Sequence, residues 1–139
     1  MRKIRILIVD DQTIVRSCLR MLIDAQPDME VVGEAQDSGS ALDKTRATKP
    51  DVVIMEIGMP DASGMGTIEQ LLKVCPLTRI LVLTRYDDPT YARSVLAAGG
   101  SAYISMQATT SDLLAAIRAV HSGQCVVDPT LVGLYCKIP

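Results

Sequence analysis

Five short apolar runs recur along this chain, and segments with helical spacing separate them. The runs cover residues 4–9, 30–35, 52–55, 80–83 and 102–104. Their length and apolar content indicate strands, and the third and fourth contain no polar residue. Strands without polar alternation are expected where a sheet is covered on both faces. The alternation therefore predicts an α/β fold, a doubly wound parallel five-stranded sheet with right-handed crossovers.

Each strand is followed by a segment with helix signals. The clearest stripe of apolar residues at helical spacing consists of Ile14, Val15, Cys18, Leu19, Leu22 and Ile23. A shorter helix is expected at residues 40–48, and Ser63-Gly64 and Asp88-Pro89 precede two more. The last helix ends at Ser122-Gly123, a C-terminal signal.

Composition limits the class of protein. The chain has 139 residues, of which 48% are hydrophobic, which suits one folded domain and excludes disorder. A net charge of -2 argues against nucleic-acid binding by this segment alone. The first apolar run is too short for a signal peptide, and no run approaches the roughly 18 residues of a membrane span. We expect a cytoplasmic protein with no membrane partner.

The four cysteines, Cys18, Cys75, Cys125 and Cys136, form no C-x-x-C pair. The single histidine, His121, does not complete a zinc set with them at any familiar spacing. Reduced, mostly packed thiols are expected for a cytosolic protein. A redox role for Cys125 or Cys136 is the alternative.

Polar residues follow the predicted strands at one edge of the sheet. Asp10-Asp11 follows the first strand, Glu56 the third, Thr84 the fourth and Ser105-Met106 the fifth. The functional site of a doubly wound sheet lies at this carboxyl edge. Carboxylates held close together repel one another, so the cluster favours a hard cation such as Mg²⁺. The simpler alternative is that an aspartate caps the first helix and Thr84 is an ordinary strand residue.

Five segments together resemble the receiver domain of bacterial two-component response regulators. They are Ile6-Leu-Ile-Val-Asp-Asp11, Asp51-Val-Val-Ile-Met-Glu-Ile-Gly-Met-Pro60, Ser63-Gly64, Ile80-Leu-Val-Leu-Thr84 and Ala98-Gly-Gly-Ser-Ala-Tyr103. The resemblance covers about residues 3–122 and implies the flavodoxin-like strand order 2-1-3-4-5. The segments at residues 56–61 and 123–130 are similar to the NarL/LuxR-type branch, whose receivers precede a helix-turn-helix domain.

The resemblance also implies a role for each site residue. Asp10, Asp11 and the backbone carbonyl of Gly58 would hold Mg²⁺. Glu56 occupies the phosphoacceptor position, which is aspartate in the family. Thr84 corresponds to the switch hydroxyl and Tyr103 to the switch aromatic. Met106 stands where the family has the lysine that grips the phosphoryl oxygens.

Two of these positions depart from the family pattern, and in the family both contact the phosphoryl group. Glu56 reaches roughly 1.5 Å further than aspartate, the length of one carbon–carbon bond, and an error of about 1 Å in reacting geometry can cost on the order of 100-fold in rate. It also weakens a Mg²⁺ site, because Mg²⁺ demands a near-ideal octahedron. Met106 removes a positive charge where phosphoryl charge must be stabilised. We therefore expect a receiver that works without phosphorylation.

Several alternatives stay open at this point. Glu56 can act as a partial mimic that accepts a hydrogen bond from Thr84 and draws Tyr103 inward. A conventional receiver that phosphorylates Glu56 is a second reading, and a stand-alone interaction module is a third. A small phosphohydrolase built on the three acids is the enzymatic alternative; we expect no enzyme, because the chain lacks a lysine there and a phosphate-cradling glycine loop. Whether a sensor kinase acts on the chain is left open.

The expected domain organisation is a receiver at residues 1–122 followed by an extension at 123–139. That extension would begin a linker to a helix-turn-helix effector, so DNA would be bound only through a domain absent from this chain. The branch also implies a homodimer through the first and last helices, with Met21, Leu114 and Arg118 as contact residues. Alternatively, Met21 and Leu114 border the core.

Overall fold

The structure is a computed structural model that describes residues 2–56, 64–84 and 89–127. The strands are β1 (Ile4–Val9), β2 (Met29–Ala35), β3 (Val52–Met55), β4 (Arg79–Thr84), β5 (Ala102–Ser105) and β6 (Val126–Val127). The helices are α1 (Thr13–Asp24), α2 (Ser38–Thr48), α3 (Gly64–Val74), α4 (Pro89–Ala97) and α5 (Thr110–His121). Each predicted strand and helix is present within two or three residues of its expected bounds.

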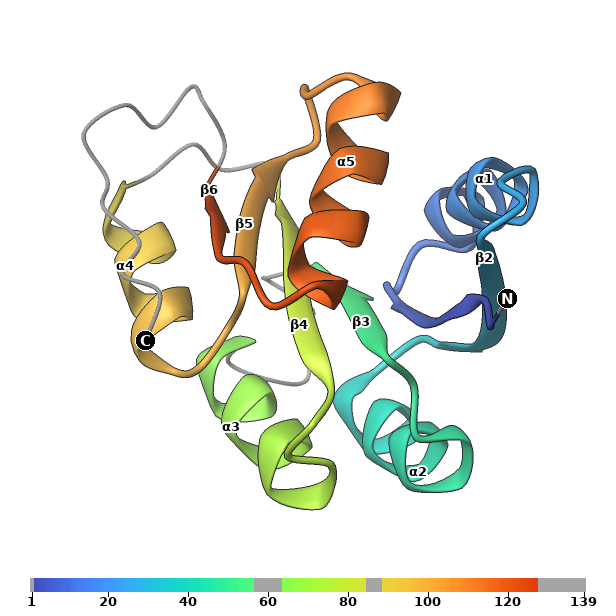
Figure 1. Cartoon of the computed structure of the whole chain (residues 1–139). Coiled ribbons are helices and arrows are strands. Elements are labelled where there is room, and N and C mark those ends of the chain that lie inside the picture. The colour runs from blue at the N-terminus through green and yellow to red at the C-terminus, as the bar shows by residue number, and fades with distance from the viewer. Residues whose placement is uncertain (1, 57–63, 85–88, 128–139) are drawn as a thin grey trace.

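All the strands pair in parallel, in the order β2-β1-β3-β4-β5-β6 (Figure 1). The predicted order 2-1-3-4-5 is confirmed. The short strand β6 was not predicted, and it extends the sheet beyond the expected receiver boundary at residue 122. Its pairing of Ala102 with Val126 and of Tyr103 with Val127 places the start of the extension against β5.

The sheet is covered on both faces, which explains why its central strands are apolar throughout. Along β1, Ile4, Ile6 and Ile8 face one helical layer, while Leu7 and Val9 face the other. This alternation follows from the two-residue repeat of a strand. Helices α1 and α5 form the first layer, and α2, α3 and α4 form the second.

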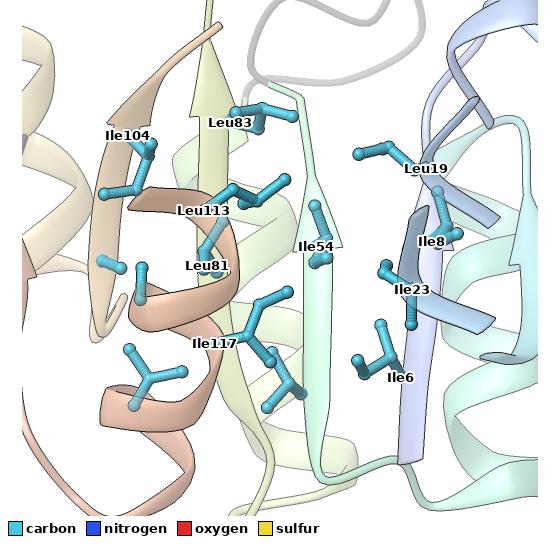
Figure 2. Packing of buried hydrophobic residues seen from close by; sticks show 14 of the residues in the cluster. Ile6, Ile8, Leu19, Ile23, Ile54, Leu81, Leu83, Ile104, Leu113 and Ile117 are labelled. Carbon is cyan, nitrogen blue, oxygen red and sulfur yellow. The ribbon is translucent and has the colours of Figure 1, made fainter. Parts of the chain in front are cut away.

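The core of the α1 and α5 layer is built from leucine and isoleucine. Figure 2 shows Leu19 and Ile23 of α1 beside β1, and Leu113 and Ile117 of α5 above β4. Ile54 of β3 lies between these two groups and is 1% exposed. The helices of this layer therefore share one core although each covers different strands.

Two sequence expectations concern the thiols and the membrane. Cys18 and Cys75 carry free thiols, whereas Cys125 is disulfide-bonded. The expectation of reduced thiols is therefore wrong at Cys125, and Cys136 lies outside the described residues.

Within the part of the chain that the structure describes, the helices are too short or too polar to cross a bilayer.

Candidate functional site

Three carboxylates meet at the carboxyl edge of the sheet. Because Val9 of β1 is in register with Met55 of β3, the residues that follow them, Asp10 and Glu56, lie side by side. One carboxylate oxygen from each of Asp10, Asp11 and Glu56 lies within 4.8 Å of the other two. Asp10 and Glu56 are buried, at 2% and 3% exposure, whereas Asp11 is exposed. The predicted acidic cluster thus forms, with one side open to solvent.

The backbone around Asp10 is fixed by hydrogen bonds. Its amide donates to the carbonyl of Ala35 at 3.0 Å, and its Oδ1 accepts from the amide of Gln12 at 2.8 Å. The Arg16 guanidinium donates to the Asp10 carbonyl and to Glu34. These bonds hold the carboxyl in place before any ligand arrives.

Burial raises the pKa of Asp10 from its ordinary value of 3.8 to about 7. A hydrogen bond with the Glu56 side chain raises this pKa further, and so does repulsion from the charges of Glu56 and Asp11. The Gln12 amide opposes the shift, because it stabilises the charged form. A hydrogen bond between two carboxyl groups requires a proton, and the raised pKa of Asp10 keeps that proton on Asp10 up to about pH 7.

The acidic cluster has the right donors for a hard divalent cation such as Mg²⁺, which takes carboxylate oxygens. Asp10, Asp11 and Glu56 would hold the cation once the carboxyl of Asp10 is ionised. Gly58, the expected source of a carbonyl ligand, lies outside the described residues.

The two expected switch residues are buried. Thr84, at the end of β4, and Tyr103, in β5, are both 0% exposed. Tyr103 belongs to the core that faces α2, α3 and α4. The aromatic ring is therefore directed inward.

Met106 follows β5 at the same edge of the sheet. Its amide donates to the carbonyl of Thr84 at 2.7 Å, which fixes its backbone beside β4. Its partly buried side chain packs against the α1 and α5 core. The residue at the expected lysine position is thus part of an apolar contact.

Sequence reasoning missed two features of this region. The first is Arg16, which binds the backbone of Asp10; its place one turn into the helix after the acid pair was an available signal. The second is an apolar groove of about 470 Å³ between α1 and α5, lined in part by Met106. No local pattern indicates a groove between helices that lie almost 90 residues apart in the sequence.

The expected contact residues of the first and last helices differ in their surroundings. Met21 of α1 is 75% exposed, so it does not border the core as the simpler alternative held. Leu114 of α5 is partly buried and packs against the core. Arg118 forms an ion pair with Asp28 at 2.8 Å and lowers the pKa of that carboxyl.

Comparison with known proteins gives the same assignment from the sequence and from the fold. The response regulator receiver domain family matches residues 6–118. The oxygen regulatory protein NreC of Staphylococcus haemolyticus (strain JCSC1435) is 41% identical over 128 residues, which are 91% of this chain and 59% of NreC. The chain thus spans about three fifths of the length of the curated relatives that it matches.

Solved structures agree with this result. A two-component response regulator of the LuxR family from Aurantimonas sp. SI85-9A1 has a TM-score of 0.89 and 32% identity, covering 93% of this chain and 92% of its own. The RcsB response regulator of Salmonella typhimurium, studied for its DNA interaction, has a TM-score of 0.86 and 25% identity. The match covers 94% of this chain and 64% of RcsB.

Proposed function

The chain belongs to the response regulator receiver family, in its NarL/LuxR-type branch, and from this premise we propose that it signals without phosphorylation. In this proposal it is an atypical receiver that regulates transcription through an attached DNA-binding domain. The observation that carries the proposal is the buried contact between Asp10 and Glu56. A phosphoacceptor must be an ionised nucleophile beside a bound Mg²⁺, whereas the neighbouring Asp10 holds a proton up to about pH 7.

A proton on Asp10 weakens the metal site. A protonated Asp10 has lost a charge and a coordinating oxygen, so Mg²⁺ must compete with a proton whose pKa is about 7. Glu56 has no room to withdraw, because it is 3% exposed. Phosphotransfer through this cluster therefore requires Asp10 to lose its proton before it can help to hold Mg²⁺.

The side chain of Met106 supports the proposal independently of Asp10. A thioether donates no hydrogen bond and carries no charge, so it cannot stabilise developing phosphoryl charge. Its side chain is also engaged in the α1 and α5 core. The inward position of Tyr103 fits an output surface that is set without phosphate.

The test uses fluoroberyllate with Mg²⁺, which imitates a bound phosphoryl group. The amide resonances of Thr84 and Tyr103 are followed by NMR during titration of the wild-type chain and of a Glu56→Asp/Met106→Lys double variant. We expect full saturable shifts in the double variant, weaker shifts in each single variant and none in the wild-type chain. Tight binding by the wild-type chain would overturn the proposal, and no binding by the double variant would show that other residues disable the site.

The partner proposals follow from the family. The attached effector is supported by the length of NreC, of which this chain matches about three fifths. A homodimer through α1 and α5 is supported by Ile14 and Met21, which expose 74% and 75% of their surface on α1. Sedimentation equilibrium of the wild-type chain and of Met21→Glu distinguishes this dimer from a monomeric, stand-alone module.

A further inference from the structure

An apolar groove lies between α1 and the start of α5. Its volume is about 470 Å³, within the range of about 300–1,000 Å³ that is usual for small-molecule sites. Ile14 and Cys18 line it from α1 and Leu83 from β4. Met106 and Thr109 line it from the connection between β5 and α5, and Leu113 lines it from α5. None of the lining residues carries a charge. The groove therefore has the size and lining of a site for an uncharged ligand.

The groove exists because the two helices of this layer cover different strands. Helix α1 packs on β1 and β2, while α5 packs on β3, β4, β5 and β6. Figures 1 and 2 show the two helices standing apart over the same face of the sheet, with Ile54 between them. Neither helix fills the space above β3 and β4 at the carboxyl edge, which leaves apolar side chains on both walls.

Met106 gives the groove its apolar inner end. It lies at the carboxyl edge of the sheet and packs against the α1 and α5 core. A polar side chain at this position would interrupt the apolar lining at this end of the groove. The residue that weakens phosphoryl chemistry thus also makes the groove continuous.

A small molecule and a partner helix are the two kinds of occupant for an apolar groove of this kind. A helix would insert only the anchors of its apolar face, spread over about two turns. The volume of about 470 Å³ lies within the range of small-molecule sites, so we take a small molecule as the occupant.

Charge and hydrogen bonding narrow the class of ligand. No residue that lines the groove carries a charge, so a charged ligand would lose its hydration without gaining an ionic partner. Thr109 Oγ1 accepts a bond from the amide of Asp112 at 3.0 Å, which leaves the Thr109 hydroxyl proton to donate. We propose that this groove binds an uncharged, mostly apolar small molecule that carries one hydrogen-bond acceptor.

Such a ligand would contact α1 and α5 at the same time. Because the two helices pack on different strands, a molecule bound between them would fix the distance between α1 and α5. It would thereby change the surface that we propose for dimerisation. This inference goes beyond the proposed function. The groove is a binding site whether or not Glu56 accepts a phosphoryl group.

The first test is titration with N-phenyl-1-naphthylamine, an uncharged fluorescent probe. We expect saturable, 1:1 binding to the wild-type chain and to Met106→Leu, which preserves the apolar lining. Affinity should fall at least about tenfold in Met106→Gln, which places an amide without a hydrogen-bond partner in the apolar lining. Ile14→Glu gives a second variant that keeps its fold, because residue 14 is 74% exposed in the first turn of α1, where an acidic side chain is favoured.

The control for non-specific adsorption is Leu77→Ala. Leu77 is 88% exposed and lies outside the groove, so this change should leave probe binding unaltered. Equal loss in Leu77→Ala, or no loss in both groove variants, would overturn the proposal. Loss of binding as protein concentration rises would instead show that a second copy of the chain fills the groove.

The two free thiols provide an independent measurement. Cys18 lines the groove, and Cys75 follows α3 in the opposite helical layer. Saturating probe should slow the alkylation of Cys18 by iodoacetamide several-fold and leave the rate at Cys75 unchanged. Equal rates at Cys18 with and without the probe would place its binding elsewhere and contradict the proposal.

Discussion

The buried carboxyl of Asp10 makes the stability of this chain depend on pH. Its pKa is about 7 in the folded state and 3.8 ordinarily, so between these values the folded chain binds more protons than the unfolded chain. Stability must then fall as pH rises through this window. The stabilisation is fully present below about pH 4 and is lost above about pH 7.

The size of the effect follows from the shift. Each pKa unit corresponds to about 1.4 kcal/mol, so a raised pKa of about 7 makes the free energy of unfolding about 2–3 kcal/mol lower at pH 8 than at pH 5. Asp28 and Asp37 have lowered pKa values and act in the opposite direction, but only near and below their ordinary value of 3.8. The interval from pH 5 to pH 8 therefore isolates Asp10.

Urea unfolding followed by circular dichroism measures this difference. EDTA is included, because a bound divalent cation would favour the ionised form of Asp10. Asp10→Asn should remove most of the dependence on pH, whereas Asp43→Asn, at an exposed site on α2, should retain it. Stability that is constant or rising from pH 5 to pH 8 in the wild-type chain would refute the reasoning.

Three further substitutions test how the helices end and begin. Gly99→Ala should lower stability by about 1–3 kcal/mol in urea unfolding, because φ is +107° and the new Cβ would lie 2.6 Å from Leu72 Cδ1. Gly123→Ala, with φ at +97° and nothing within 4 Å, should cost less, and an equal cost would exclude the clash. Asp37→Ala should cost about 1 kcal/mol in thermal unfolding, since Asp37 accepts from the Ser40 amide at the start of α2.

The sequence predicted those parts of the fold that repeat along the chain. The apolar runs and the stripe on the first helix specify five strands, their helices and two covered faces, because burial imposes a period on each element. Strand β6 has two residues, Val126–Val127, which is too short to carry a period. Its position depends on pairing with β5, which is a tertiary interaction.

At the site, too, the features set by a sequence pattern were predictable and those set by tertiary contacts were not. The cluster of Asp10, Asp11 and Glu56 was predictable, because parallel strands bring their carboxyl ends to one edge. The raised pKa of Asp10 was not, since it depends on burial and on the direction of two side chains. Nor was the groove beside Met106, which depends on the spacing of α1 and α5.

The central claim is that this receiver does not accept a phosphoryl group, and mass spectrometry tests it directly. The wild-type chain and the Glu56→Asp/Met106→Lys variant are incubated with acetyl phosphate and Mg²⁺, and intact masses are compared. The account predicts an unmodified wild-type chain and a double variant that gains one phosphoryl group. Stoichiometric phosphorylation of the wild-type chain at Glu56 would contradict it.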